Sequence, residues 1–534
     1  MASSPLSPDD RRGVLAVALI VFASFAVYAT VRAPIPAVNE PHYLCKARHF
    51  WDPSWCARDF FLESSNAHYV FYATWGLLAA VCDFPLAAWI GRVLGWALLA
   101  FGWTALARQI TSDRRVAVWS TWMFLGLQAV GSFSGEWVVG GIEAKVVSYA
   151  CVLLSLAALF RGQTLLSSAW AGIATSFHPV IGIWNLAALL LAGATGIVTG
   201  DLESTTRVRA ASALQRGILL MGIFAACALP GILPAVSVLR DADPKLSHVA
   251  DEIQVYVRLS HHLDPSRFPL SAYVGYAALA VGWCFAQRGL PTKIRRMANA
   301  YVVAAIVILV GGLVLGWWPR WPEIAEKGLV AAEKQIPREN YAGLMKFYPF
   351  RLADAMLPIL GSLAVAAGLN RAMAGRARGA IAWSAAALIF AGSLLSPAID
   401  RNPSRMTPEK LAAWIDTCRW VRESTAADAL FVTPVEGWAF KWYAQRAEYL
   451  NYKDCPQDAK GIVEWQRRRW AQYRWQERHR NPGTNRYSAH ALPALTKLTS
   501  ANYLIVTAPV TAAAEPIYRN AYFAVYRLDD GAKQ

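Results

Sequence analysis

Two glutamates stand where a carboxylate at a membrane boundary would do chemistry. Glu40 follows the first long apolar segment, near residues 13–32, and Glu143 follows a later apolar segment. Ionisable side chains at membrane depth are costly and by default indicate function. A carboxylate there serves as a general base, or as a ligand of Mg²⁺ or Mn²⁺ beside a phosphate leaving group. We take Glu40 and Glu143 as the catalytic candidates and as candidate metal ligands, although this chemistry does not require a metal.

The loop after Glu40 carries side chains of both charge signs that would contact a sugar and a diphosphate together. His42, Tyr43 and Asp59 are the candidates within it. The alternative is a solvated loop with ordinary ion pairs. Glu143 also has an alternative role, because an acid at the start of a helix interacts favourably with the helix dipole.

Three basic side chains at predicted helix ends are candidates for binding phosphate: His178, Lys346 and Arg351. Arginine makes bidentate contacts to phosphate oxygens, and a histidine at this depth orients a phosphate or shuttles a proton. The alternatives are a histidine that is hydrogen-bonded in a turn, and an Arg351 that pairs with Asp354 one turn later.

The composition is that of a polytopic membrane protein. Of 534 residues, 55% are hydrophobic and 16% are charged, with a mean hydropathy of +0.29, whereas soluble domains are about 25% charged. Apolar runs of about 17–22 residues are each long enough for a helix that crosses a ~30 Å hydrocarbon core. We expect about eleven spanning helices, near residues 13–32, 85–106, 116–133, 146–160, 164–177, 179–199, 217–238, 271–286, 298–317, 352–369 and 379–397. The shorter stretch 68–83 predicts a partly buried helix on the outer side.

The net charge of +16 arises mostly from basic loops between the apolar runs. Lys and Arg accumulate in cytoplasmic loops. In this chain they are roughly twice as dense in the loops on the side of the N-terminal segment as in the loops on the opposite side. This predicts a cytoplasmic N-terminus and a periplasmic or otherwise extracytoplasmic C-terminus, in a bacterial inner membrane. We expect membrane lipid and no nucleic acid as partners, because the many Trp and Tyr residues suit interfacial belts.

The composition changes after residue 397. Residues 1–397 predict an all-α transmembrane bundle, and residues 398–534 predict an extracytoplasmic α/β domain. The bundle has four expected outer loops, at residues 33–68, 134–145, 239–269 and 318–351. The last of these resembles a flexible substrate loop.

Short strands and helices alternate in the expected α/β domain. Strands are predicted at residues 429–433, 447–452, 503–507 and 522–527, and helices near 409–423 and 458–478. Thr407 is the expected N-cap of the first helix. Two cysteine pairs, Cys45 with Cys56 and Cys418 with Cys455, are candidate disulfides if these regions face an oxidising compartment.

The run Asn39-Glu40-Pro41-His42-Tyr43 resembles the opening of the first outer loop in the GT-C superfamily of polytopic glycosyltransferases. That superfamily includes protein O-mannosyltransferases, aminoarabinose transferases and the catalytic subunit of oligosaccharyltransferase. Glu143 is similar in place to the second acid of the family, and residues 420–431 resemble the start of its soluble domain. The family's first acid is usually Asp, and Asn39 stands in its place, which leaves the role to Glu40.

The resemblance implies an enzyme that moves a sugar from a polyprenyl-phosphate-linked donor to an unknown acceptor on the outer face of the membrane. Glu40 would be the base or a metal ligand and Glu143 a second acid, while Arg351, Lys346 and His178 would hold the donor phosphate. The alternative is a non-catalytic membrane protein on the same scaffold, either a carrier of lipid or polysaccharide or an assembly partner. A transporter would place its charges near the membrane midplane, whereas these lie at the outer mouth.

Overall fold

The computed structural model describes residues 8–200, 210–240, 243–317, 341–373, 376–397, 399–435 and 437–528. Contacts divide the described residues into two compact units. The bundle unit comprises Met1–Arg32, Arg92–Ala235 and Gln254–Ala398. The α/β unit comprises Ala33–Gly91, Val236–Ile253 and Ile399–Gln534.

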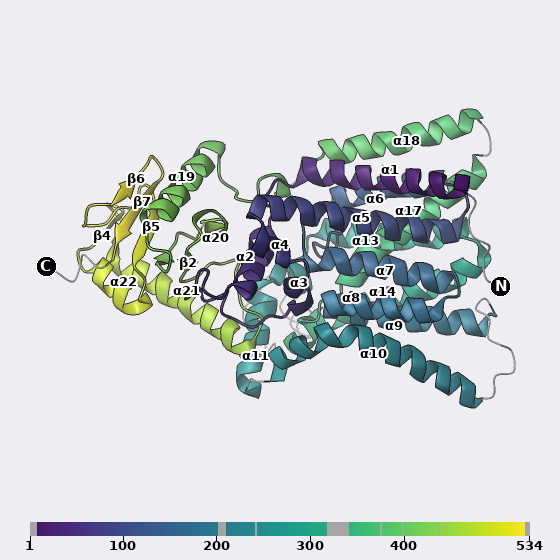
Figure 1. The fold of residues 1–534 in the computed structure, drawn as a ribbon, viewed down its shortest axis with the longest axis horizontal. Helices are drawn as coiled ribbons and strands as arrows, with labels where there is room; N and C mark the ends of the chain where they lie inside the picture. Colours follow the sequence, from purple (N-terminus) through teal and green to yellow (C-terminus); the bar gives the residue numbers. More distant parts are fainter. Residues whose placement is uncertain are drawn as a thin grey trace, which may run out of the picture. The chain divides into compact units, whose positions relative to one another are not determined.

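Long helices that run roughly along one direction build the bundle unit (Figure 1). They are α1 (Pro8–Arg32), α5 (Phe84–Ile110), α6 (Arg115–Val130), α7 (Ala144–Phe160), α8 (Thr164–Phe177), α9 (Pro179–Val198), α10 (Ala210–Arg240), α13 (Leu270–Ala286), α14 (Thr292–Trp317), α17 (Arg351–Ala372) and α18 (Arg376–Leu395). Short turns of helix lie between some of them: η1 (Ile253–Arg258), α12 (Ser260–Leu263), η2 (Pro265–Arg267), η3 (Gln287–Gly289) and α16 (Ala342–Met345).

Each apolar segment that was predicted to span the membrane is helical. Within the described residues, seven helices are long and apolar enough to cross a membrane: α1, α5, α9, α10, α13, α14 and α17. The helices α6, α7 and α8 are shorter, at 16, 17 and 14 residues. The chain is therefore an integral membrane protein, and the expected eleven spans and their sidedness stay predictions.

Helix α7 lies at the centre of the bundle unit, since every one of its residues is buried. Indole groups of α5 pack near it and find polar partners: Trp96 Nε1 donates to the carbonyl of Gly140 at 3.0 Å, and Trp103 Nε1 donates to Ser120 Oγ at 3.0 Å. Such pairing matters because an unsatisfied N–H is costly in an apolar interior. Glu143, the residue that precedes α7, is therefore held inside protein at the start of a buried helix.

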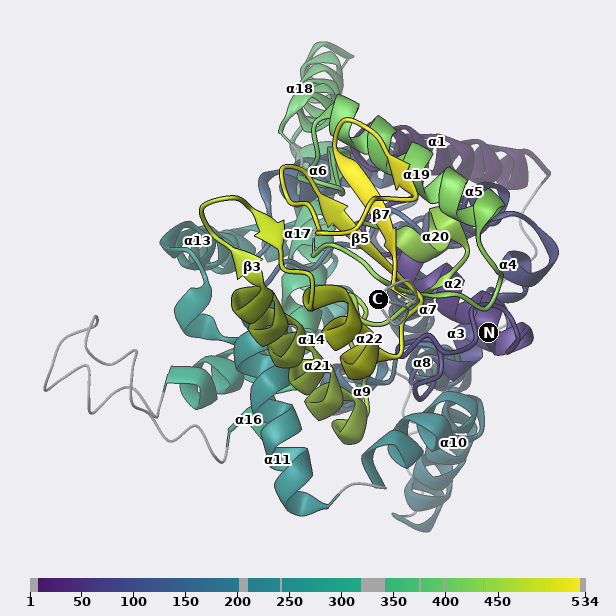
Figure 2. The same ribbon diagram turned by 90° about the vertical axis from the view of Figure 1, so that its left-hand side faces the viewer.

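A five-stranded sheet organises the C-terminal part of the α/β unit (Figure 2). Its strands are β1 (Leu430–Val432), β2 (Ala447–Glu448), β5 (Tyr503–Thr507), β6 (Tyr518–Arg519) and β7 (Phe523–Arg527), in the order β2-β1-β5-β7-β6. Strands β1, β2 and β5 are parallel, while β7 runs antiparallel to β5 and β6. A separate two-stranded ladder joins β3 (Arg480–Asn481) to β4 (Arg486–Tyr487).

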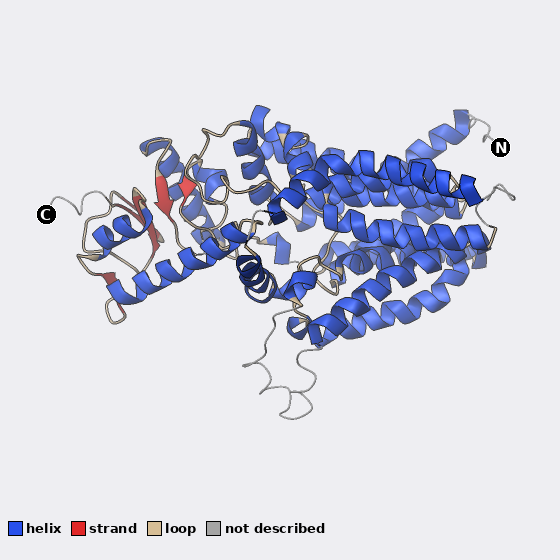
Figure 3. Cartoon of the chain, turned by 90° about the horizontal axis from the view of Figure 1, so that it is seen from below, coloured by secondary structure: helices blue, strands red, loops and turns tan. Residues whose placement is uncertain are grey.

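The remaining elements of the α/β unit are helical (Figure 3). They are α2 (Glu40–Trp51), α3 (Tyr69–Ala73), α4 (Leu77–Val81), α11 (Pro244–Glu252), η6 (Ile399–Arg401), α19 (Pro408–Ser424), α20 (Phe440–Ala444), α21 (Ala459–His479) and α22 (Ala491–Thr499). Thr407 caps α19 as predicted, because its side chain accepts from the N–H of Lys410.

The fold class predicted from the sequence is confirmed: a helical membrane bundle is followed by a C-terminal α/β region. The first loop, however, groups with the C-terminal residues rather than with the bundle. Phe60 packs beside buried Ile462 and Trp465 of α21, together with Ala250 of α11. These apolar contacts join three distant segments of the chain into one unit. The expected domain boundary at residue 397 stays a prediction.

The two candidate disulfides are not present. Among the described residues, which include all eight cysteines, no disulfide is formed. Cys45 and Cys56 are both buried, and burial raises the pKa of each thiol well above its usual value. The order of the first loop therefore comes from packing and polar contacts instead of a covalent link.

Candidate functional site

Five charged or titratable side chains of the bundle unit form what we term the carboxylate–cation cluster: Glu136, Glu143, Lys145, His178 and Arg351. Arg351 Nε lies 2.8 Å from Glu136 Oε2. Lys145 Nζ lies 3.7 Å from Glu136 Oε1 and 3.7 Å from Glu143 Oε2. Glu136 is thus shared by two cations, in the way that a phosphate group would be.

The starts of three helices bring these side chains together. Glu143 is the N-cap residue of α7, Lys145 is in the first turn of that helix, and Arg351 is the first residue of α17. His178 separates α8 from α9. The sequence predicted Glu143, His178 and Arg351 as site residues, and the structure gathers all three into one cluster.

His178 and Arg351 contact each other directly, with 2.9 Å between His178 Nε2 and Arg351 Nη1. A guanidinium group only donates, so Nε2 of the imidazole is the acceptor in this contact. The other ring nitrogen, Nδ1, lies 3.5 Å from the N–H of Ile181, so His178 also caps the start of α9.

Two aromatic rings hold the cations in place. The ammonium of Lys145 lies 3.8 Å from the ring centre of Trp137, and the guanidinium of Arg351 lies 3.9 Å from that of Tyr348. Cation–π contacts of this kind restrict a long side chain without neutralising its charge. The two cations are consequently pre-organised for an anionic ligand.

Asp354 fixes the loop that carries Glu136. Its carboxylate accepts from the N–H of Phe133 at 2.6 Å, from the N–H and hydroxyl of Ser134 at 2.8 and 3.0 Å, and from the N–H of Glu136 at 3.2 Å. The sequence offered Asp354 only as a partner for Arg351. Its described hydrogen bonds instead give it a supporting role beneath the cluster.

His262 supports the same loop from the other side. Its Nδ1 donates to the carbonyl of Ser134, and the next residue, Gly135, has φ +78° and would place a Cβ 2.6 Å from the His262 ring. Burial, with a smaller effect of His261, lowers the pKa of His262 to about 3. The neutral ring of His262 therefore occupies the space that a side chain at position 135 would need.

Glu136 and Lys145 are the members of the cluster that sequence reasoning did not select. Both lie in the short loop 134–145 beside Glu143. Glu136 Oε1 is buried and lies 3.7 Å from the ammonium of Lys145, and the hydroxyl of Tyr149 also interacts with the Glu136 carboxylate. The available signal was the concentration of two acids and one lysine in a loop of twelve residues.

Lys346 lies just outside α16, where it is half-buried and its ammonium is 5.6 Å from the ring centre of Phe347. Its predicted contact with phosphate stays a prediction. Residues 318–340, which make up most of the predicted substrate loop, lie outside the described part of the chain.

The remaining predicted residues lie in the α/β unit. Glu40 is the first residue of α2, is fully buried, and accepts from the N–H of Ala37 at 2.7 Å. Tyr43 Oη lies 3.3 Å from His68 Nε2, and His42 Nδ1 lies 2.9 Å from Asp454 Oδ1. Because Glu40 and Glu143 belong to different units, their expected action at one site stays a prediction.

Asp59 has the contacts of a structural residue. Its carboxylate accepts from the N–H groups of Phe61, Leu62 and Glu448 at 3.1, 3.0 and 2.9 Å, and it lies 3.3 Å from Lys441 Nζ. These contacts occupy both oxygens of the carboxylate, and its expected role in substrate binding remains untested.

The carboxylates of the carboxylate–cation cluster face cationic side chains. Among the described residues, no group of three or more His, Cys, Asp or Glu side chains is arranged to hold a metal ion. In the cluster itself, the ammonium of Lys145 lies beside a carboxylate oxygen of both Glu136 and Glu143. A metal held by Glu40 and Glu143 stays an expectation.

The fold and the cluster define an integral membrane protein with an α/β region and a pair of cations that share one carboxylate. Residues 412–472 match the family model called domain of unknown function DUF6798. ArnT from Cupriavidus metallidurans bound to undecaprenyl phosphate is a structural neighbour, with 13% identity, a TM-score of 0.42 and coverage of 96% of each chain. No curated protein matches the sequence.

Proposed function

We propose that this chain is a GT-C-type membrane glycosyltransferase, which moves a sugar from a polyprenyl-phosphate-linked donor to an acceptor on the outer face of the membrane. The observation that carries the proposal is the position of Glu136 between Arg351 and Lys145. Two cations that share one carboxylate, a buried Lys145 and a half-buried Arg351, form a site for a phosphate group of a lipid-linked donor.

Donor binding would replace one anion by another. The phosphate takes the place of the Glu136 carboxylate against Arg351 and Lys145, so the cations never lose their counter-charge in a buried setting. Trp137 and Tyr348 keep the cations in position during the exchange. His178, which contacts Arg351, orients the guanidinium toward the phosphate.

Transfer then needs a base and a leaving group. A carboxylate takes the proton of the acceptor hydroxyl, and the hydroxyl oxygen bonds to the anomeric carbon. The bond between that carbon and the phosphate oxygen breaks, and polyprenyl phosphate leaves with the electron pair. We assign the base to Glu40 and the contact with the acceptor to Glu143, and the cations stabilise the charge on the departing phosphate.

The second candidate is a non-catalytic carrier or assembly partner on the same scaffold. One observation favours it: each acid of the carboxylate–cation cluster already lies beside a cation, which suits a stable lipid-binding site as well as a reactive one. Such a protein would bind polyprenyl phosphate and its sugar derivatives without turnover.

The test is sugar transfer in membranes that contain the full chain, with a labelled polyprenyl-phosphate sugar pool as donor. Glu40→Gln, Glu143→Gln and Arg351→Gln are compared with Glu464→Gln, which changes an acid on α21 that pairs with Arg467 and Arg468. We expect transfer that the first three variants abolish and the control retains. Binding of the donor without any transfer by the wild-type chain would support the carrier instead.

A further inference from the structure

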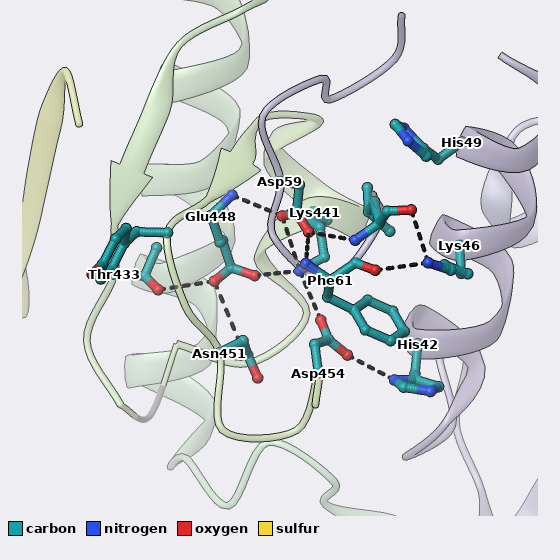
Figure 4. A network of polar contacts seen from close by, with 12 residues as sticks. His42, Lys46, His49, Asp59, Phe61, Thr433, Lys441, Glu448, Asn451 and Asp454 are labelled. Atoms are coloured by element: carbon teal, nitrogen blue, oxygen red, sulfur yellow. Dashed lines mark hydrogen bonds and ion pairs between the residues drawn. The ribbon is translucent and has the colours of Figure 1, made fainter. Parts of the chain in front are cut away.

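The buried charges around Lys441 in the α/β unit are paired with one another (Figure 4). The side chain of Lys441 is 3% exposed, and its Nζ lies 2.7 Å from Asp454 Oδ2, 2.9 Å from Glu448 Oε2 and 3.3 Å from Asp59 Oδ2. Burial opposes the charge of Lys441, but the three carboxylates outweigh it and raise its pKa well above the usual value. This network joins the first loop to β2 and the following turn, so its role is structural.

An excess of positive charge lies instead along α21 and the β3–β4 ladder. Residues 459–490 contain eight Lys and Arg and only two Glu. Both glutamates have partners within α21: Glu464 lies 2.5 Å from Arg467 Nε and 2.8 Å from Arg468 Nε, and Glu477 accepts from the hydroxyl of Tyr473 at 2.6 Å. The acids of this segment therefore do not neutralise its charge, and the segment attracts anions.

The apolar face of α21 is occupied by packing within the α/β unit. Ile462 and Trp465 are buried and pack with Ala250 of α11. Further along the helix, the buried Trp475 lies against Tyr487 of β4, with 4.7 Å between the ring centres. A helix that lies in a membrane surface inserts its apolar face into the lipid. In α21 that face is covered by protein, so its exposed face suits a partner other than a bilayer.

The exposed face of α21 combines arginine and aromatic side chains. We term it the basic–aromatic face, and it consists of Arg467, Trp470, Tyr473, Arg474 and Arg478, all of which are exposed. These residues are adjacent or recur at intervals of three or four positions, which places them on one side of a helix. From the first to the last, the face extends for about 16 Å along the helix axis.

Two aromatic rings lie at the centre of this face. Trp470 and Tyr473 keep 49% and 50% of their surface exposed. They meet edge-on, with 5.9 Å between the ring centres and 83° between the planes, and the hydrogen bond to Glu477 restrains the Tyr473 ring. Large exposed aromatic side chains that adjoin each other are typical of binding surfaces.

Two arginines one turn apart flank the aromatic pair. Among the described residues, no carboxylate lies at ion-pair distance from Arg474 or Arg478, whereas Arg467 on the same face pairs with Glu464. The Nε of Arg474 donates to the carbonyl of Trp470 at 3.4 Å, a long contact that binds the guanidinium weakly. Both guanidinium groups can therefore make bidentate contacts to a carboxylate or a phosphate.

We propose that the basic–aromatic face of α21 is a docking surface for an anionic saccharide chain, whose sugars carry carboxylate or phosphate groups. Arg474 and Arg478 bind the anionic groups, while Trp470 and Tyr473 pack against the sugar rings. Charge complementarity requires an anionic partner, and the aromatic pair requires one that also offers apolar ring surface. The docking itself is independent of the proposed function, but the identity of the docked chain as the acceptor of sugar transfer rests on that function.

The chain offers matched variants for a test. Arg474→Gln combined with Arg478→Gln removes two positive charges from the basic–aromatic face. Arg419→Gln combined with Arg422→Gln removes two from the exposed surface of α19 and is the control. Trp470→Ala removes one ring, and Trp470→Phe restores an aromatic surface. All five positions are exposed, so folding should survive, and thermal unfolding of each variant checks this.

The measurement is binding of labelled oligogalacturonate and of labelled phosphomannan to the full chain in detergent micelles, without a sugar donor. We expect both to bind more tightly than a neutral maltooligosaccharide and than polyglutamate, which has carboxylates but no sugar rings. The double variant on α21 should weaken binding by about tenfold or more, and Trp470→Ala by about three- to tenfold. Trp470→Phe should recover part of that loss, and the control on α19 should stay within about twofold of the wild type.

Four outcomes would overturn the inference. The wild type could bind neither anionic saccharide, or both double variants could lose affinity equally, which would show that overall charge attracts the ligand. Polyglutamate could bind as tightly as the saccharides, which would leave no role for the rings. Single-stranded DNA or vesicles of phosphatidylglycerol could bind more tightly through the same residues, which would make nucleic acid or lipid the occupant.

This measurement does not depend on transfer, so it separates the inference from the proposed function. A chain that transfers sugar but binds no anionic saccharide would contradict the docking surface alone. A chain that binds the saccharides through α21 without any transfer would support the docking surface and contradict only the proposed function.

Discussion

Asp354 and Ser134 form a two-point contact, in which Asp354 Oδ2 accepts from both the N–H and the hydroxyl of Ser134. The two residues are 220 positions apart in the chain. The contact ties the first turn of α17, which begins with Arg351, to the loop that carries Glu136. The ion pair between Arg351 and Glu136 therefore depends on a carboxylate that belongs to neither residue.

Removing this carboxylate should loosen the loop and weaken the ion pair above it. Asp354→Ala leaves several buried N–H groups without an acceptor, and we expect the free energy of unfolding to fall by about 2–4 kcal/mol. Asp354→Asn keeps one acceptor oxygen and should lose less. Thermal unfolding of the full chain in detergent measures both, and an alanine variant as stable as the wild type would contradict the prediction.

Glu136 should compete with phosphate for the two cations. Glu136→Gln keeps the size of the side chain but removes the negative charge beside Arg351 and Lys145, so we expect inorganic diphosphate to bind about tenfold more tightly, equivalent to about 1.4 kcal/mol. Isothermal titration of the detergent-solubilised chain measures this change.

The matched control for that experiment is Glu464→Gln, on the surface of α21, which should leave diphosphate affinity unchanged. Arg351→Gln should move affinity in the opposite direction. If Glu136→Gln bound diphosphate more weakly than the wild type, Glu136 would be a support of the anion site and not a competitor.

Local patterns in the sequence predicted the elements well. Thr407 and Pro408 identified the start of α19, and alternating apolar residues identified β5 and β7 to within a residue or two. These features depend on neighbours in the chain, which a single sequence contains. The same reasoning selected Glu143, His178 and Arg351 as site candidates, because each lies at the end of a predicted apolar helix.

Long-range pairs could not be predicted in this way. His42 and Asp454 are 412 residues apart, and no periodicity connects them. The sequence also suggested disulfides for two cysteine pairs, and neither is formed among the described residues. Residue type and compartment do not show how far apart two cysteines lie. The roles of Asp354 and Lys441 likewise emerge only once helices and loops have packed, because a buried charge takes its function from the partners that surround it.

The stability of the bundle unit should fall on mild acidification because of His262. Its pKa is lowered from 6.5 to about 3 by burial, so between these values the unfolded chain binds a proton that the folded chain excludes. The contribution of His262 to the free energy of unfolding is therefore fully present above about pH 6.5. It is lost as the pH falls, by about 1.4 kcal/mol per pH unit. From pH 6.5 to pH 5 the expected loss is about 2 kcal/mol.

Thermal unfolding at several pH values measures this dependence. His262→Asn offers a donor to the carbonyl of Ser134 without a titrating group, and its midpoint should vary less between pH 6.5 and pH 5 than that of the wild type. Identical pH profiles for the two proteins would show that acid sensitivity arises elsewhere.

Close approach of α8 and α10 should depend on one glycine. A Cβ at Gly231 would lie 2.0 Å from the carbonyl oxygen of Ser176, which is backbone and unable to rotate away. Gly231→Ala must therefore move one helix, and we expect it to destabilise the bundle unit by about 1–3 kcal/mol. Gly222 lies in the same helix with nothing within 4 Å of the added Cβ, so Gly222→Ala should be neutral or stabilising by up to about 1 kcal/mol. Unfolding of the two variants in detergent isolates the steric term, because the substitution and its effect on helix propensity are the same. Equal stability of the two variants would mean that the helices do not approach as closely as these contacts require.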